Sequence, residues 1–388
     1  MSNTIAFDKA VALLHKSSTP AGFTAAGAAA EDNYCRVWTR DSVVCGLAAL
    51  LTNDVLLIET FKQSLITIWE HQHPTGFLPS NVDVNSKVSY GGTVGRADVP
   101  SWAIIGLCMY AKYSKDSTLL KTYEPQLKLA LNVMDAWEFN GKHLIYVPQS
   151  GDWADEYLQH GYILFDQLLR LWALQLAADF YRNKIYADKV VLIKKTIENN
   201  FFNRPDDNNW YAGNLIHQKK DAPKSFWWMG FNPAQIYPQY DLQANALAVL
   251  LKIGTDDQQK SCITYTLQLL AERETMLPSF WPAIQFEDTK MDELKNNFAY
   301  RFRNNPGEFH NAGLWPVWNG LMCAALKLSG NEDSQIILRQ NMLNVVSKNN
   351  FEMNECYNAK TNTACGVHEC AWSGAGIIFS ERGHLLFS

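Results

Sequence analysis

Apolar residues recur at steps of three and four along most of the chain, and this spacing predicts α-helices rather than strands. The pattern predicts about twelve helices separated by polar segments. Pro100 opens one of them and Ser329-Gly330-Asn331 separates two others, as expected of helix start and stop signals. The predicted ranges are 5–16, 41–52, 54–71, 100–113, 117–137, 161–183, 186–200, 241–253, 256–271, 312–329, 332–348 and 370–380.

The connections between these helices are alternately short and long. Short ones, such as 53–54 and 330–331, suit antiparallel helix pairs, and function collects on long loops. We therefore predict an all-α fold, an (α/α)6 toroid of six hairpins with the long loops and a cleft at one end. A minor β-hairpin is expected near 209–213, and no low-complexity linker divides residues 1–388, which predicts a single domain. The long connections are 17–40, 72–99, 138–160, 201–240, 272–311 and 349–369.

Charge and hydropathy exclude several classes of function. The net charge is −5 and no long basic run occurs, so a nucleic-acid partner is not expected. No stretch of 18 apolar residues is present, so no membrane span is expected. Residues 1–20 lack the basic start and apolar core of a signal peptide, which predicts a cytoplasmic protein.

The eight cysteines do not form a metal-binding pattern. No CxxC pair occurs, and most of the cysteines sit singly in apolar helical segments, where a free thiol acts as a small hydrophobe. Cys356, Cys365 and Cys370 cluster around His368, but we favour a structural interpretation of this cluster over a metal site. We expect no metal and no organic cofactor.

Aromatic residues make up 12% of the chain, and many of the 13 tryptophans lie in polar loops rather than in apolar runs. Large aromatics fill the core of any big protein. Aromatic faces beside Asp and Asn can also line a pocket for a ligand that carries both CH faces and hydroxyl groups. Sugars have this chemistry, so a carbohydrate ligand is one of two interpretations at this point.

Two loop segments in the first half of the chain carry candidate chemistry. Arg40 and Asp41 open an apolar helix, where Asp41 can cap free amides or, with Arg40, grip a hydroxylated ligand. Asp152, Trp153 and Asp155 lie just before another helix. A carboxyl held against an indole loses hydration, so its pKa rises and it can act as a general acid.

Two further segments lie near the C-terminus. His310 and Trp315 belong to an aromatic loop, and because no Ser or Cys stands in a nucleophile setting, His310 is expected to form hydrogen bonds. Glu352 and Glu355 lie in an Asn-rich aromatic loop. In a toroid, this loop and the Asp155 loop can face each other across the cleft.

These segments resemble, in their joint order, the (α/α)6 clan of glycoside hydrolases, most closely the neutral/alkaline invertases of glycoside hydrolase family 100. The resemblance runs from about residue 31 to the C-terminus, and Trp153-Ala154-Asp155 is also similar to the acid loop of glycogen-debranching glucosidases. The matching segments are Trp38-Thr39-Arg40-Asp41, Gly95-Arg96-Ala97-Asp98-Val99-Pro100-Ser101-Trp102, Tyr240-Asp241-Leu242-Gln243-Ala244-Asn245, Phe309-His310-Asn311-Ala312-Gly313-Leu314-Trp315-Pro316 and Glu355-Cys356-Tyr357-Asn358-Ala359-Lys360.

The resemblance implies the roles of two carboxylates. The family's acid lies shortly before a His-Gly pair, here His160-Gly161, so Asp155 is the nearest match and Asp152 the runner-up. The family's catalytic Glu corresponds to Glu355, with Glu352 as the weaker alternative. The acid loop continues Glu-Tyr after Asp155 where the invertases have Arg-Arg, so the resemblance implies hydrolase chemistry more strongly than it implies sucrose specificity.

The sequence thus predicts an inverting, exo-acting glycoside hydrolase for a small α-glycoside or a sucrose-like oligosaccharide. Asp155 is expected to be the more desolvated general acid, and Glu355 the ionised general base. There are two alternatives: a sugar epimerase that uses His310 and His368, and a non-catalytic carbohydrate-binding protein. The oligomeric state is left open. The expected substrate-binding residues are Trp38, Arg40, Asp41, Asp98, Asp152, Trp153, His310 and Trp315.

Overall fold

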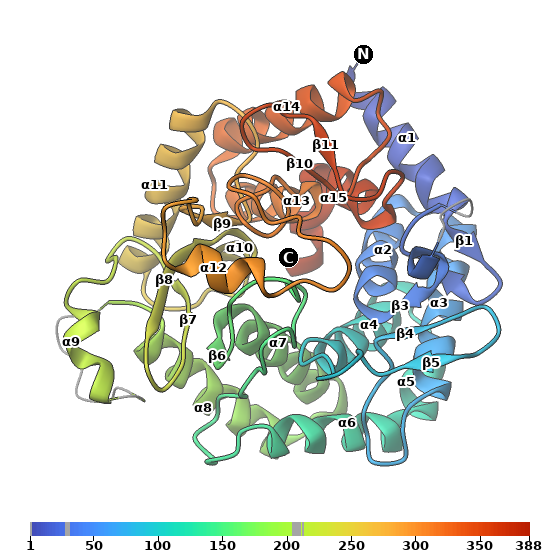
Figure 1. Cartoon of the computed structure of the whole chain (residues 1–388). Helices are drawn as coiled ribbons and strands as arrows, with labels where there is room; N and C mark the ends of the chain where they lie inside the picture. The colour runs from blue at the N-terminus through green and yellow to red at the C-terminus, as the bar shows by residue number, and fades with distance from the viewer. Residues whose placement is uncertain (1, 28–31, 204–210, 212) are drawn as a thin grey trace.

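The computed structural model describes residues 2–27, 32–203, 211 and 213–388. Six helices form an inner ring in which each contacts the next and the last contacts the first (Figure 1). Each inner helix follows a long loop, so all six begin at the same end of the ring. The inner helices are α2 (Thr39–Thr52), α4 (Val99–Ser114), α7 (Leu164–Tyr181), α10 (Leu242–Leu250), α13 (Pro316–Leu328) and α15 (Ala371–Arg382).

An outer ring of helices surrounds the inner one (Figure 1). Side chains cap several of them: Asp54 accepts the Leu56 and Leu57 amides, and Thr255 forms a capping box with Gln258. The predicted helical hairpins and their ring are therefore confirmed within the described residues, with 117–137 divided into α5 and α6. The outer elements are α1 (Ser2–Lys16), α3 (Val55–Glu70), α5 (Thr118–Thr122), α6 (Glu124–Ala136), α8 (Lys184–Asn200), α11 (Asp256–Arg273) and α14 (Glu332–Lys348).

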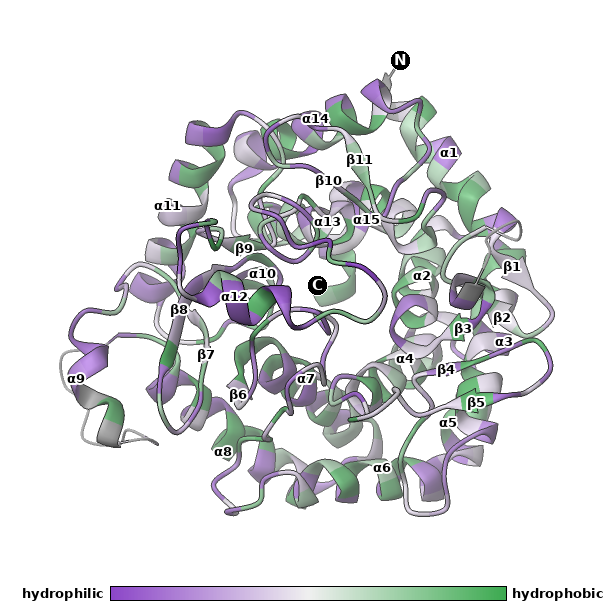
Figure 2. Cartoon of the chain, viewed as in Figure 1, coloured by the Kyte–Doolittle hydropathy of each residue, from purple (hydrophilic) through white to green (hydrophobic). Residues whose placement is uncertain are grey.

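Burial distinguishes the two rings. Every residue of α10 is buried, because inner helices are covered both by the outer ring and by the barrel interior. The outer helices expose hydrophilic residues on their outward side (Figure 2). At the end opposite the long loops, the C-terminal turn η3 (Gly383–Phe387) enters the barrel, where Phe387 lies 4.9 Å from the ring of Trp172. None of the described helices has the length and apolar character needed to cross a bilayer.

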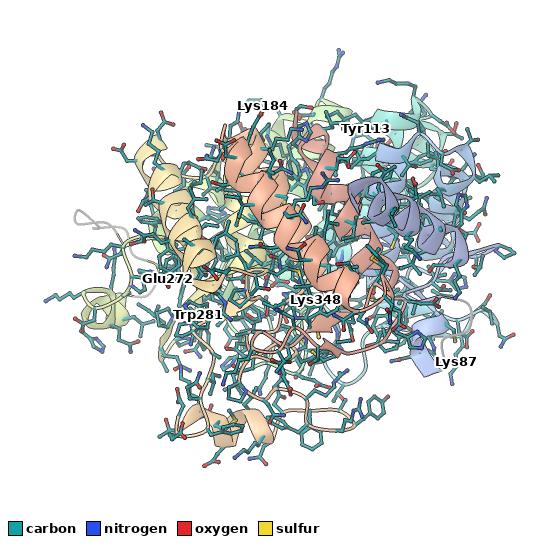
Figure 3. The ribbon with its side chains drawn as sticks, turned by 90° about the horizontal axis from the view of Figure 1, so that it is seen from above. Lys87, Tyr113, Lys184, Glu272, Trp281 and Lys348 are labelled. Carbon is teal, nitrogen blue, oxygen red and sulfur yellow. The ribbon has the colours of Figure 1, made fainter. Side chains whose placement is uncertain are left out.

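The long loops contain more β-structure than the minor hairpin that the sequence predicted. The described residues include four small antiparallel sheets, because loops that lie over the barrel pair their backbone groups with one another. The side view places Lys87, Trp281 and Lys348 toward one end of the molecule and Tyr113 and Lys184 toward the other (Figure 3). The sheets are β1 (Ser18–Thr19) with β2 (Gly22–Phe23); β3 (Val37–Trp38), β4 (Asn81–Val82) and β5 (Val88–Ser89); β6 (Tyr162–Ile163), β7 (Trp228–Phe231), β8 (Ile236–Asp241) and β9 (Phe280–Trp281); and β10 (Cys356–Tyr357) with β11 (Ala364–Cys365).

The hairpin predicted at 209–213 falls mostly outside the described residues, which include only Tyr211 and Gly213 of this stretch. Gly213 begins the short turn η2 (Gly213–Leu215), which leads into α9 (Ile216–Lys219). A hairpin does occur later in the same connection, where β7 pairs with β8. One further short helix, α12 (Lys290–Lys295), lies across the loop end of the ring (Figure 1).

Candidate functional site

The inner helices bring acidic residues together where they begin. Asp41 lies in the first turn of α2, Asp98 directly precedes α4, and Asp166 lies in the first turn of α7. Arg40 Nη1 donates a hydrogen bond of 2.8 Å to Asp98 Oδ2, and Arg40 Nε lies 3.8 Å from Asp41 Oδ2. Burial raises the pKa of Asp41 to about 6, because Arg40 only partly offsets the loss of hydration. Arg40 therefore stands between two buried carboxylates, Asp41 and Asp98, whereas the sequence alone left capping and ligand binding as two possible roles for Asp41.

The two candidate acids lie in different environments. Asp152 is buried: its Oδ1 accepts the Ala154 amide at 2.9 Å, and the Gln159 side chain donates to Oδ2. Burial, helped by the nearby charge of Asp98, raises the pKa of Asp152 to about 7. Asp155 keeps 37% of its side chain exposed and receives a hydrogen bond of 2.7 Å from Arg96 Nη2.

The sequence predicted that Asp155 would be more desolvated than Glu355, and the structure shows the opposite order of burial. Asp155 is partly exposed, whereas Glu355 is only 6% exposed. The sequence placed Asp155 beside Trp153, but in the structure the indole of Trp153 turns into the core. Asp155 is left at the surface with a guanidinium partner. Asp152 has the desolvated environment that was expected of Asp155.

Glu355 is held by two donors. Tyr34 Oη donates to Oε1 at 2.9 Å, and the Val367 amide donates to Oε2 at 3.2 Å. Burial raises the pKa of Glu355 to about 7, although the positive charge of Arg303 and the Tyr34 hydrogen bond act in the opposite direction. The alternative, Glu352, is exposed.

The turn beside Glu355 requires glycine. Gly366 has a φ of +78°, and a Cβ at this position would lie 2.4 Å from Glu355 Oε2. Both the backbone conformation and the close approach of the carboxylate therefore depend on the absence of a side chain. Glu355 directly precedes β10, so the β10–β11 ribbon, the glycine turn and Tyr34 together fix its position.

An aromatic cluster joins three of the expected binding residues. The ring of Trp153 lies 5.2 Å from both His310 and Trp315, and His310 stacks on Trp315 at 5.6 Å with an interplanar angle of 12°. Trp372 extends the cluster toward the acidic residues, because its ring lies 5.7 Å from Trp315 and 5.6 Å from the Arg40 guanidinium. Arg40, Asp41, Trp153, His310 and Trp315 thus form one connected group.

The aromatic residues of this group are packed inside the protein. Trp153 and Trp315 are 3% and 1% exposed, so in this structure their faces contact other rings rather than an open surface. Burial lowers the pKa of His310 well below its usual range, so the imidazole is neutral. Trp38 is half-buried, and its indole donates to the Asn33 carbonyl at 2.7 Å.

Three charged or polar residues of the site were not among the predicted ones: Tyr34, Arg96 and Arg303. Arg303 Nη2 lies 3.1 Å from Glu156 Oε1, and its guanidinium lies 3.7 Å over the ring of Phe309. Its charge also acts on Glu355. Arg303 therefore pairs with Glu156 of the acid loop and acts on Glu355 through its charge. Arg96 stood in one of the segments that carry the resemblance, and Tyr34 lay in the long connection 17–40, whereas nothing in the pattern around Arg303 distinguished it.

The cysteine cluster forms part of the support of Glu355. Cys356 and Cys365 are register partners across β10 and β11, with their Sγ atoms 3.5 Å apart, and both are free thiols. Cys370 is buried just before α15. Among the residues that the structure describes, no group of three or more His, Cys, Asp or Glu side chains is arranged to hold a metal ion.

No family model matches the sequence, and no curated protein matches it. Solved structures do match. A GH63 mannosylglycerate hydrolase from Thermus thermophilus has a TM-score of 0.70 at 13% identity, covering 96% of this chain and 99% of that one. A glucoamylase from Saccharomycopsis fibuligera has a TM-score of 0.62 at 11% identity, covering 100% and 95%.

A rhamnosidase from Klebsiella oxytoca has a TM-score of 0.65 at 14% identity, and the match covers 99% of this chain and 64% of that one. The fold that the sequence predicted is therefore the fold of several glycoside hydrolases. At such low identity the likeness establishes the architecture alone, and it does not single out the invertases among the enzymes that have it.

Proposed function

We propose that the protein is an inverting glycoside hydrolase that acts on a small α-glycoside. The observation that carries the proposal is the position of Arg303, which pairs with Glu156 of the 152–156 loop and whose positive charge acts to lower the pKa of Glu355. Arg303 thus relates Glu355 to the loop that carries Asp152 and Asp155, and both segments belong to long loops at the same end of an (α/α)6 ring. Most glycosidases use two carboxyl groups, one on either side of the glycosidic bond. The structural neighbours, which are a mannosylglycerate hydrolase, glucoamylases and rhamnosidases, support the same reaction class.

In this proposal Asp155 is the general acid. Both oxygens of Asp152 are already occupied, by the Ala154 amide and by Gln159, and the side chain is buried. Asp155 has an exposed carboxyl that a glycosidic oxygen can reach. The hydrogen bond from Arg96 to Asp155 has to break when the substrate binds, so that Asp155 can donate a proton to the departing group. Asp152 then supports the loop from inside.

Glu355 is the general base in the same proposal. It takes a proton from a water molecule that attacks the anomeric carbon from the face opposite the leaving group. An inverting pair places its carboxyl groups about 6.5–9.5 Å apart to leave room for this water. Tyr34 and Val367 orient the carboxylate. Arg40, Asp41 and Asp98 provide hydrogen-bonding groups for sugar hydroxyls, and the buried ring cluster holds Arg40 in place.

The epimerase alternative gains no support from the two histidines. His310 is buried among rings, whereas His368 is exposed on the segment between β11 and α15. An epimerase needs two bases on opposite faces of one sugar, and these two residues lie in unlike environments. A non-catalytic carbohydrate-binding protein would bind sugar without hydrolysing it, so a measurement of turnover separates this alternative from a hydrolase.

The test is a screen of disaccharides and aryl α- and β-glycosides, with the anomer of the first product followed by proton NMR. We expect hydrolysis of at least one α-glycoside with release of the β-anomer. Release of the α-anomer would overturn inversion. No hydrolysis of any substrate, combined with saturable sugar binding, would favour the non-catalytic alternative.

A further inference from the structure

We propose that Cys356 and Cys365 are a thiol modification site: hydrogen peroxide joins them in a reversible disulfide, and this disulfide slows the candidate active site through Glu355. The two cysteines are register partners across β10 and β11, and their Sγ atoms lie 3.5 Å apart. Both are free thiols, and Glu355 directly precedes Cys356 in the chain. Formation of the disulfide does not depend on the proposed function, whereas its effect on turnover rests on it.

The backbone places the two cysteines at the separation that a disulfide needs. Residues that face each other in an antiparallel pair have Cα atoms about 4.5–5.5 Å apart, inside the range of about 4.4–6.8 Å that disulfides show. The two side chains lie on the same face of the ribbon, because their sulfur atoms are in contact. The Sγ atoms have to close from 3.5 Å to about 2 Å, which a small shift of one strand can supply.

The two thiols are suited to different steps of the oxidation. Six of the eight cysteines are buried, Cys356 among them, but Cys365 is partly exposed and is the member of the pair that a small oxidant meets first. The Cys356 thiol donates a hydrogen bond to Cys365 Sγ and lowers the pKa of Cys365, whereas burial raises the pKa of Cys356 well above its usual range. Because the thiolate is the nucleophile, Cys365 attacks the oxidant and Cys356 is the resolving thiol.

The oxidation is a two-electron reaction in two steps. The Cys365 thiolate attacks one oxygen of hydrogen peroxide, the O–O bond breaks, hydroxide leaves and a sulfenic acid forms. The Cys356 sulfur then attacks Cys365 Sγ, so that the S–S bond forms and the S–OH bond breaks. The two hydroxide ions take up the two thiol protons. In total, two thiols are oxidised to one disulfide and one peroxide is reduced to two water molecules.

Of the two strands, β10 is the one that is held in place. Tyr357 and Leu314 exchange backbone hydrogen bonds of 2.8 and 2.9 Å, which attach β10 to the segment before α13. Ala364 of β11 and Gly366, which follows this strand, are exposed. Closure of the Sγ atoms should therefore displace β11 rather than β10.

The displaced residues are the ones that hold Glu355. The Val367 amide donates to Glu355 Oε2 at 3.2 Å, and the Val367 carbonyl accepts from the Glu355 amide at 2.8 Å. Gly366, next to Cys365, lies so close to Oε2 that it leaves no room for a Cβ. A shift of β11 moves these partners, so the carboxylate loses the position proposed for the general base. Misplacement of a catalytic group by about 1 Å can cost about 10²-fold in rate.

Peptide mapping tests the modification site. Trypsin cleaves after Lys360, so Cys356 and Cys365 fall in two different peptides, 349–360 and 361–382. The folded protein is treated with hydrogen peroxide, its remaining thiols are blocked with iodoacetamide, and it is digested without reductant. We expect the two peptides to be linked, and dithiothreitol to separate them.

Cys370 supplies the matched control, because it lies in the same peptide as Cys365 but is buried. Cys370→Ser should keep the link and Cys365→Ser should lose it. The mapping of the wild-type protein needs no variant, so it decides the question even where a substitution unfolds the protein. Three results would overturn the site: no link in the folded wild type, a link that persists in Cys365→Ser, or Cys365 recovered as a sulfinic acid without the link.

Turnover tests the effect on Glu355. With a substrate found in the glycoside screen, peroxide should lower kcat at least about 10-fold in the wild type and in Cys370→Ser, and dithiothreitol should restore it. Dithiothreitol reduces a disulfide but does not repair methionine sulfoxide, so recovery excludes oxidation of Met353 as the cause. Cys365→Ser should keep its own untreated rate after peroxide.

A linked protein with unchanged kcat would overturn the effect on Glu355. If the substrate screen finds no hydrolysis while the two peptides are linked, the disulfide site stands and the proposed hydrolase function does not.

Discussion

Tyr34 donates a 2.9 Å hydrogen bond to Glu355, although 321 positions separate the two residues in the sequence. The closed ring explains this contact: α2 and α15, the first and last inner helices, are neighbours, so the loops that precede them meet at the same point. The proposed base is therefore held by the two ends of the chain. A contact of this kind can position the carboxylate and also influence its ionisation.

Tyr34→Phe should raise the pKa of Glu355 further, because the variant lacks the hydrogen bond that in the wild type favours the ionised carboxylate. The acidic limb of the pH–rate profile of kcat/KM is expected near pH 7 in the wild type, and it should move to higher pH in the variant. Tyr113→Phe is the control, because the Tyr113 hydroxyl bonds to the Leu385 carbonyl near the other end of the barrel. An unmoved limb in Tyr34→Phe would show that the tyrosine does not tune the base.

Asp155→Asn should lower kcat by about 10²-fold or more on a substrate with a poor leaving group, since general acid catalysis typically contributes 10²–10⁴-fold. An aryl glycoside with a good leaving group should recover much of the loss, because its departure needs less protonation. Asp152→Asn is the companion variant, and its loss should not depend on the leaving group. If the leaving-group dependence is found in Asp152→Asn instead, Asp152 is the acid.

Glu355→Gln should lower turnover by about 10²-fold or more on every substrate, because the activation of water is lost whatever the leaving group. The variant should still bind sugar, since the amide retains the shape of the carboxyl. Glu352→Gln, an exposed neighbour in the same loop, should keep its activity. Recovery of Glu355→Gln by a good leaving group would show that the acid and base roles are exchanged.

Gly366→Ala should impair catalysis through the position of Glu355. The new Cβ would lie 2.4 Å from Oε2, so the carboxylate has to move. Gly141→Ala is matched to it, because Gly141 also has a positive φ, of +67°, but a Cβ added there would have no atom within 4 Å. Both changes should lower stability by roughly 1 kcal/mol through backbone strain. Only Gly366→Ala should reduce kcat, and equal kinetics in the two variants would count against the packing argument.

The stability of the fold should fall as the pH rises from about 4 to about 7. Burial raises the pKa of Asp152 and Glu355 to about 7, that of Asp41 to about 6, and those of Asp166 and Asp241 well above their usual range. Burial lowers the pKa of His143, His310 and His384, which acts in the opposite direction. These carboxyls outnumber the histidines, so in this range the folded protein binds more protons than the unfolded chain. The contribution of these carboxyls to stability is fully present at pH values below their pKa values in the unfolded chain. It is lost as the pH rises through their pKa values in the folded protein.

Thermal unfolding followed by circular dichroism across this pH range measures the slope. Asp152→Asn removes one of the titrating groups and should flatten the curve. Asp188→Asn, at an exposed site on α8, should leave it as in the wild type. A wild-type Tm that rises from pH 4 to pH 7 would contradict the burial of these carboxyls.

The sequence alone determined the helices and their arrangement. Apolar spacing located the helices to within a few residues, because a buried helical face repeats locally and needs no knowledge of distant partners. The alternation of short and long connections then indicated the ring. The same spacing argument identified Arg40, Asp41, Asp152, Trp153, His310 and Trp315 as residues of loops that meet at one end.

Only the tertiary structure decided the environment of each of these side chains. The sequence cannot tell that Asp152 is buried while Asp155 pairs with Arg96, because burial depends on which loops cover which helix ends. Arg303 stands in a segment without helical periodicity, and it acquires a role only because Glu156 and Glu355 come to lie near it. Periodicity records which face of a local element is apolar, whereas pKa values, ion pairs and ring contacts arise between residues that are far apart along the chain.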